Sequence, residues 1–114
     1  MKNFYKEDYK LLRDIAKDTG TVLATYKFEK DSVVVEYNGL TIAFRPMTNG
    51  PDCRMLAVSV SYCAKKDKFK KKIGKYNALY KMEAGEFVQV PLAEFYREYG
   101  VEETKAVLSN SFVL

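Results

Sequence analysis

The chain has 114 residues, 47% of them hydrophobic and 30% charged, a size and balance that favour a single globular domain spanning residues 1–114 and argue against intrinsic disorder. It has no histidine, and therefore lacks the commonest general base and the commonest metal ligand, which argues against most enzyme classes and against a metal site. Its net charge of +4 comes from residues 65–81, where eight lysines accompany one aspartate in a chain that is otherwise mildly acidic.

The first segment predicts an amphipathic helix of about fourteen residues within FYKEDYKLLRDIAKDTG. Its apolar side chains recur at helical spacing and fall on one side of a helical wheel: Phe4, Leu11, Leu12 and Ile15. Gly20 follows the last apolar position and is expected to end the helix. We expect this stripe to lie in the core.

From Thr21 the sequence changes to runs rich in Val, Ile, Thr, Tyr and Phe, which predict three antiparallel strands. The runs are TVLATYKFEK, SVVVEYN and LTIAFRP. Lys30-Asp31 is expected to form the first turn. Asn38-Gly39 is the strongest hairpin signal, because a type I′ turn requires positive φ at both positions and these two residues tolerate it.

The next residues, 46–53, contain two prolines, Gly, Asn and Asp and predict an exposed loop. The run RMLAVSVSYC then predicts a fourth strand, half-buried because large apolar residues alternate with Ala57, Ser59 and Ser61. EFVQVPL predicts a fifth strand. Pro91 suits the first turn of a helix that ends before Gly100, and a last helix is expected at about 102–108.

Together these elements predict an α+β fold with an antiparallel sheet of four or five strands. An N-terminal helix, a basic helix after strand four and one or two C-terminal helices are expected to pack on one face of the sheet. No apolar run reaches the ~18 residues of a membrane span, and the first ten residues lack the apolar stretch of a secretory signal, so we expect a cytoplasmic protein. Cys53 and Cys63 lack CxxC spacing and are interpreted as reduced thiols. The alternative is a disulfide, which would require the loop at Cys53 to fold back onto the end of the fourth strand.

The lysine-rich run KKDKFKKKIGKYNALYK predicts a helix that begins near Phe69, with Asp67 as its N-cap. At 100° per residue, Phe69, Ile73, Tyr76 and Tyr80 share a stripe, with Leu79 at its border, that we expect to be buried. The remaining small and basic residues are the candidate partner- or phosphate-binding site: Lys68, Lys70, Lys71, Lys72, Gly74, Lys75, Ala78 and Lys81.

The pair Gly74 and Ala78 leaves a gap on this helix, and glycine there costs about 1 kcal/mol relative to alanine. Either a phosphate backbone or another chain approaches the helix at this gap, or another part of the same fold does. Lysines bind phosphates as point charges, and the run contains no arginine to read bases, so any nucleic-acid binding is expected to be sequence-nonspecific.

The run CAKKDKFKKKIGKYNALYK resembles a pattern in small proteins encoded by bacteriophages. The pattern is a strand that ends in Cys or Ser, Asp-x-Phe, a basic pair, Gly and an Ala-containing helix, followed by Gly and a short strand. In this chain it is carried by Cys63, Asp67, Phe69, Lys71, Lys72, Gly74, Ala78 and Leu79, within about a quarter of the sequence. Lys75 and Lys81 stand where such proteins often have arginine. The pattern brings no established reaction with it.

The resemblance implies a non-enzymatic protein that binds and inhibits a nucleic-acid-handling or defence protein of the host, in the host cytoplasm. The alternative is nonspecific binding of nucleic acid, or of a phosphate-bearing ligand such as a signalling nucleotide, through the basic helix at 65–81. An enzyme is the least favoured interpretation, because Asp52, Asp67 and Glu83 have no spacing that predicts a shared site. No cofactor is expected, and the sequence leaves both a monomer and a homodimer open.

Overall fold

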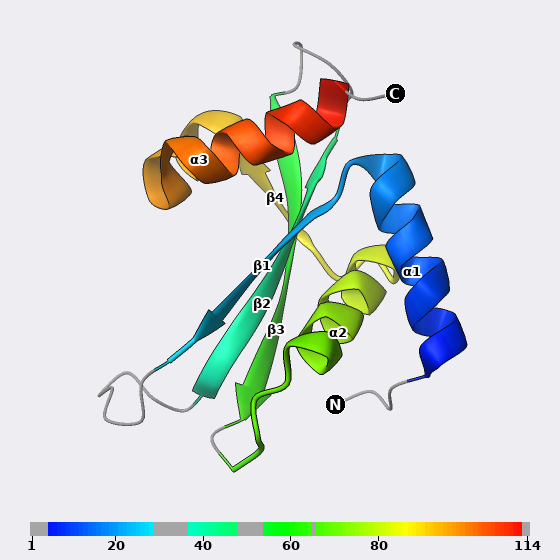
Figure 1. Cartoon of the computed structure of the whole chain (residues 1–114). Coiled ribbons are helices and arrows are strands. Elements are labelled where there is room, and N and C mark those ends of the chain that lie inside the picture. The colour runs from blue at the N-terminus through cyan, green and yellow to red at the C-terminus, as the bar shows by residue number, and fades with distance from the viewer. Residues whose placement is uncertain (1–4, 29–36, 48–53, 65, 113–114) are drawn as a thin grey trace.

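The computed structural model describes residues 5–28, 37–47, 54–64 and 66–112. Its elements in chain order are α1 (Lys6–Thr19), β1 (Val22–Lys27), β2 (Tyr37–Pro46), β3 (Met55–Ala64), α2 (Lys71–Glu83), β4 (Val88–Pro91) and α3 (Leu92–Phe112) (Figure 1). The strands form one antiparallel sheet in the order β1-β2-β3-β4. The α+β class and the antiparallel sheet predicted from the sequence are confirmed. Among the described residues, no helix is both long enough and apolar enough to span a membrane.

Helix α1 confirms the fourteen-residue helix predicted before Gly20. Gly20 adopts φ 69°, a left-handed conformation that favours glycine, and its N–H faces the last carbonyls of the helix. The buried side chains are Tyr9, Leu12 and Ala16. They pack mainly against α2 rather than against the sheet. Leu11, predicted to lie in the core, is instead 60% exposed.

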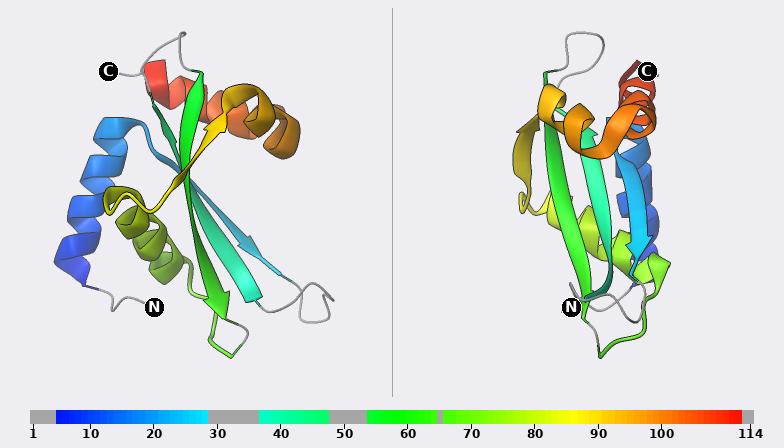
Figure 2. Two further views of the ribbon diagram at one scale, coloured as in Figure 1. Left: turned by 180° about the vertical axis from the view of Figure 1, so that it is seen from behind. Right: turned by 90° about the vertical axis from the view of Figure 1, so that its left-hand side faces the viewer.

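The two faces of the sheet carry side chains of different size. On one face, large residues of β2 and β3 alternate inward, Ile42 and Phe44 beside Leu56 and Val58, and α3 packs on them through Phe95. The other face carries the small residues Thr41, Ala43, Ala57, Ser59 and Ser61, and α2 lies on it. The prediction that all helices pack on one face is therefore wrong, since the sheet lies between α2 and α3 (Figure 2).

The C-terminal half also follows the sequence closely. β4 pairs with the first four residues of β3, and α3 begins at Leu92, one residue after Pro91. Phe95 is fully buried and meets the ring of Phe44 edge-on at 4.7 Å. Gly100 interrupts α3 with φ 86° and ψ −174°, so that two helical segments follow β4 as predicted.

The predicted Asn38-Gly39 hairpin turn is wrong, because both residues lie inside β2, next to a register shift. Gly39 pairs with Lys27 and Cys63, and a side chain there would come within 2.7 Å of the Phe69 ring. Glycine thus serves close packing and not positive φ. The turn predicted at Lys30-Asp31, most of the SVVVEYN strand, most of the 46–53 loop and Cys53 lie outside the described residues.

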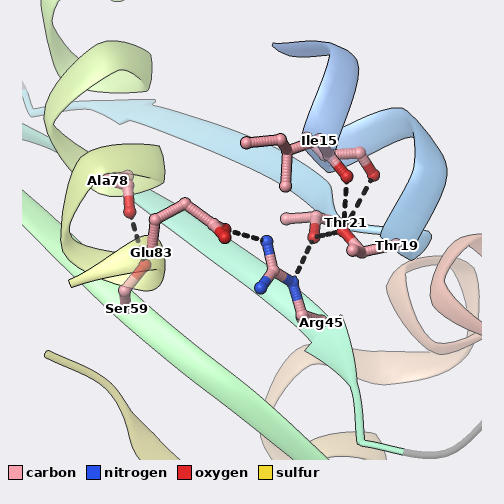
Figure 3. A network of polar contacts seen from close by, with 8 residues as sticks. Ile15, Thr19, Thr21, Arg45, Ser59, Ala78 and Glu83 are labelled. Atoms are coloured by element: carbon pink, nitrogen blue, oxygen red, sulfur yellow. Dashed lines mark hydrogen bonds and ion pairs between the residues drawn. The ribbon is translucent and has the colours of Figure 1, made fainter. Parts of the chain in front are cut away.

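A polar network joins the ends of several elements (Figure 3). Arg45 of β2 donates from Nε to Thr21 Oγ1 at 2.8 Å and forms an ion pair with Glu83 at the end of α2. Thr21 shares a hydrogen bond with Thr19, whose hydroxyl donates to the Ile15 carbonyl at 2.8 Å. The network fixes the end of α1 and the end of α2 to the same strand.

Candidate functional site

Helix α2 begins later than the sequence predicts. Its N-cap is Lys70, without a side-chain capping bond, and Lys71 is its first residue. Asp67 is therefore not the N-cap. Its backbone instead closes a turn after β3, where its N–H donates to the Ala64 carbonyl at 3.0 Å and its own carbonyl accepts from the Asn38 side chain. These contacts hold residues 66–70 outside the helix.

Gly74 and Ala78 face the sheet, not the solvent. Ala78 is fully buried, and its carbonyl accepts a hydrogen bond from Ser59 Oγ at 2.8 Å. A β-carbon at Gly74 would overlap Thr41 Oγ1 and lie 3.3 Å from Thr41 Cβ. Of the two alternatives for this gap, the structure therefore shows the second, because the protein's own sheet makes the close approach.

The aromatic stripe predicted for this helix is buried only in part. Tyr76 is fully buried, Phe69 and Ile73 are half-buried, and Tyr80 is exposed. Leu79, at the predicted border, is buried. Helix α2 has this orientation because its small residues, and not its aromatic ones, lie where the helix comes closest to the sheet.

The candidate lysines divide into two groups. The exposed group lies at and before the start of α2: Lys68, Lys70, Lys71 and Lys72. Lys75 and Lys81 are half-buried. The Lys81 ammonium donates at 2.9 Å to the carbonyl of Val60, on the edge of β3 that faces away from β2. The outward basic surface of this segment is thus confined to its first part.

A groove between α1 and α2 extends that basic surface. It has a volume of about 530 Å³, and Tyr9 and Asp14 contribute to its lining. Five cationic side chains from the two helices border it: Lys6, Lys10, Arg13, Lys17 and Lys72. Among the described lining residues, one carboxylate accompanies five cations, so the groove has a net positive charge and attracts anions.

Tyr9 brings two of these cations together. The guanidinium carbon of Arg13 lies 5.6 Å from the centre of the Tyr9 ring, and the Lys72 ammonium lies 6.0 Å from it. The ring itself is buried and meets Tyr76 edge-on at 6.3 Å between centres. The π-electrons of the ring attract each of these cations. Tyr9 thus helps to position a cation from each helix at the groove.

Sequence reasoning missed the part of the groove that α1 contributes. The signal was present, because Lys6, Lys10, Arg13 and Lys17 recur at i, i+4, i+7 and i+11 and so share one helix face. The apolar stripe of this segment predicts the helix and its buried side, but not the role of its cationic side. The packing of α1 on α2, which joins this cationic stripe to Lys72, follows from tertiary contacts that one sequence does not show.

The described residues show no cluster of three or more potential metal-ligating His, Cys, Asp or Glu side chains. Cys63 is a free thiol. Burial raises its pKa, and the nearby Asp67 carboxylate raises it further. A raised pKa disfavours the reactive thiolate at neutral pH. The chemistry that the site offers is the binding of anions.

No protein-family model, curated protein or solved structure matches this chain. The resemblance of residues 63–81 to small bacteriophage-encoded proteins stays an expectation drawn from the sequence.

Proposed function

We propose that this protein is a non-catalytic binder of nucleic acid that contacts the phosphate backbone through the groove between α1 and α2. The observation that carries the proposal is a groove between two helices far apart in the sequence, whose described lining residues include five cations and one carboxylate. From Lys6 to Lys17 the stripe spans about 16 Å along α1. A nucleic-acid strand that advances about 3.4 Å per nucleotide would present several consecutive phosphates over that length.

The composition of the groove sets the expected mode of binding. Four of its five cations are lysines, which bind phosphate without reading base edges, and Arg13 alone offers a planar fork. Binding is therefore nonspecific in sequence and depends on salt. With up to five phosphates neutralised, the logarithm of the affinity should fall with the logarithm of salt concentration at a slope of about −4.5 on duplex DNA, and about −3.5 on single strands.

Fluorescence anisotropy with labelled oligonucleotides tests the proposal. The groove variant combines Lys10→Glu, Arg13→Glu and Lys72→Glu. We expect this variant to lose at least about a hundredfold in affinity at about 50 mM salt. The dependence of affinity on salt should also weaken, by the contribution of about three neutralised phosphates. The wild-type chain should bind single and double strands of any sequence under the same conditions.

A matched control changes net charge equally at residues that do not line the groove. Lys27, Arg97 and Lys105 are all exposed and belong to β1 and α3. Their combined substitution by glutamate should lower the affinity only a few-fold, through the long-range field. Equal losses in the control and groove variants, or no binding by the wild-type chain at about 50 mM salt, would refute the groove as the binding site.

A second proposal is a host protein partner that handles nucleic acid or acts in defence, which this chain would bind and inhibit. The favouring observation is on α1, where Leu11 is 60% exposed and Tyr5 is exposed on the helix that carries the cationic stripe. Exposed apolar anchors with a charged rim are typical of protein interfaces. A pull-down from bacterial lysate, with and without nuclease, separates the two proposals, because a partner retained after nuclease treatment and lost in Leu11→Asp supports the second.

A further inference from the structure

The sheet face opposite α2 carries, near its end, a row in which two tyrosines lie on either side of a leucine. Tyr26 of β1, Leu40 of β2 and Tyr62 of β3 are direct cross-strand partners, so their side chains project from the same face. The neighbouring rows, towards Phe44 and Val58, are buried beneath α3. At the end of the face, Tyr26 is 38% exposed and Tyr62 is 49% exposed. In the described part of the chain, α3 thus covers only part of this face.

The Tyr62 ring of this row packs against a neighbouring ring. The Tyr37 ring lies 4.5 Å from that of Tyr62, tilted by 31°, and so restricts the plane of Tyr62. Burial raises the pKa of Tyr99 on α3; Glu98 adds to the shift, and Tyr26 and Tyr62 contribute as well. These tyrosines therefore lie together at the border of α3, with Glu98 as the nearby carboxylate.

The row is connected to the basic surface. Tyr62 lies two residues before the end of β3, and Lys66 and Lys68 follow in the segment after that strand. Both lysines are exposed and belong to the segment that continues to Lys72 in the groove. A strand of nucleic acid that leaves the groove past Lys70 and Lys68 would therefore reach the edge of the aromatic row without losing contact with cations.

We propose that Tyr26, Leu40 and Tyr62 form a stacking platform for the bases of single-stranded nucleic acid. The inference rests on the proposed function, because the groove holds the phosphates and the platform selects the kind of strand. The rings of Tyr26 and Tyr62 lie on either side of Leu40, on two strands separated by β2, and offer ring surfaces to unpaired bases. Stacking on such rings tolerates any base. Duplex bases are already stacked and cannot reach the rings. The platform gives the protein a preference for single strands that the groove lacks.

The experiment compares a single-stranded and a duplex oligonucleotide of equal length by anisotropy. Stacking contributes enough per base that Tyr62→Leu should weaken single-strand binding by roughly 5- to 150-fold. Duplex binding should stay within about twofold, since phosphate contacts carry it. Tyr62→Phe keeps the ring and should keep single-strand affinity. Tyr96→Leu is the matched control, because Tyr96 is 52% exposed on α3, outside the row, and it should change neither affinity.

A second measurement reports stacking directly. The chain has no tryptophan, so its intrinsic fluorescence comes from tyrosine. Saturating single-stranded DNA should quench the wild-type emission more strongly than that of the double variant Tyr26→Leu/Tyr62→Leu, while duplex DNA should quench the two alike.

Failure of the platform and failure of the groove give different results. The Lys10/Arg13/Lys72 groove variant should lower the affinity for single strands and for duplexes together. If it lowers neither affinity, the groove proposal fails, and the effect of Tyr62→Leu on single-strand affinity still tests the platform. Equal loss of single-strand and duplex affinity in Tyr62→Leu, or no loss, overturns the platform. A dimer in light scattering that dissociates in Tyr62→Leu overturns it as well, since a second copy would then cover the face.

Discussion

Replacing Gly74 with alanine tests the close contact between α2 and the sheet. A β-carbon at residue 74 would overlap Thr41 Oγ1, which is fully buried and has no hydrogen-bond partner in the described structure. Alanine favours a helix over glycine by about 1 kcal/mol. Overpacking of a tight core contact costs about 1–3 kcal/mol. The energetic cost of the overlap therefore equals or exceeds the gain in helix propensity. Gly74→Ala should lower the free energy of unfolding by up to about 2 kcal/mol.

The effect of Gly74→Ala on the free energy of unfolding should change sign when Thr41 is replaced by alanine. In a Thr41→Ala background the overlapping oxygen is gone, and Gly74→Ala should raise the free energy of unfolding by about 1 kcal/mol. The double-mutant cycle then gives a coupling of about 1–3 kcal/mol between residues 41 and 74. Urea unfolding followed by circular dichroism measures each free energy, and equal m-values would show that the unfolded state is unchanged.

Gly85 provides the control for this cycle. It has φ 80° and open space where a β-carbon would lie. Gly85→Ala should cost about 1 kcal/mol through backbone strain, with no coupling to Thr41. If Gly74→Ala stabilises the protein by about 1 kcal/mol in both backgrounds, the packing inferred for α2 is wrong.

Three further substitutions probe other contacts. Phe95→Ala should lower the free energy of unfolding by about 3–5 kcal/mol in urea, because its fully buried ring fills the core under α3; a loss below about 1.5 kcal/mol would contradict that burial. Glu83→Gln should cost about 1 kcal/mol at low salt and less at 1 M NaCl, since it weakens the part-buried ion pair with Arg45. In a Cys53→Ser background, Cys63 of the folded protein should react with iodoacetamide at pH 8 more slowly than Cys63 of the unfolded chain, because its pKa is raised. Since the pKa of the folded state lies above that of the unfolded state, the free energy of unfolding should fall as pH rises through 9 and beyond. A folded-state thiol as reactive as the unfolded one would contradict both expectations.

The elements could be predicted from the sequence because their signals are local. Apolar spacing and Gly20 define α1, and period-two alternation defines β3. Gly100 separates two helical segments through its positive φ. Each of these features depends on a few neighbouring residues, so one sequence carries enough information to place them.

The failed predictions concern residues whose role depends on distant partners. Asn38-Gly39 has the composition of a hairpin turn, yet Gly39 is needed because the Phe69 ring, thirty residues away, packs over it. Ser59 and Ser61 were interpreted as the solvent side of a strand, but α2 covers them. Small residues on this sheet face can be buried because α2 comes close to the sheet at Gly74. Local periodicity in the sequence does not show which helix will pack on which strand.

The candidate site was predicted in part for the same reason. The lysine run placed Lys68, Lys70, Lys71 and Lys72 on the surface, where the structure has them. Which other cations join them depends on the docking of α1 on α2 through Tyr9 and its neighbours.

The hydrogen bond from Lys81 to the Val60 carbonyl has a consequence for how the protein behaves at high concentration. β4 pairs only with Met55–Val58, so the outer edge of β3 beyond Val58 has no strand beside it in the described structure. Unpaired strand edges recruit strands from other molecules and so start aggregation. An ammonium group on the edge carbonyl blocks that pairing and would bury a charge in any intermolecular sheet. We therefore expect Lys81 to disfavour edge-to-edge pairing of folded chains.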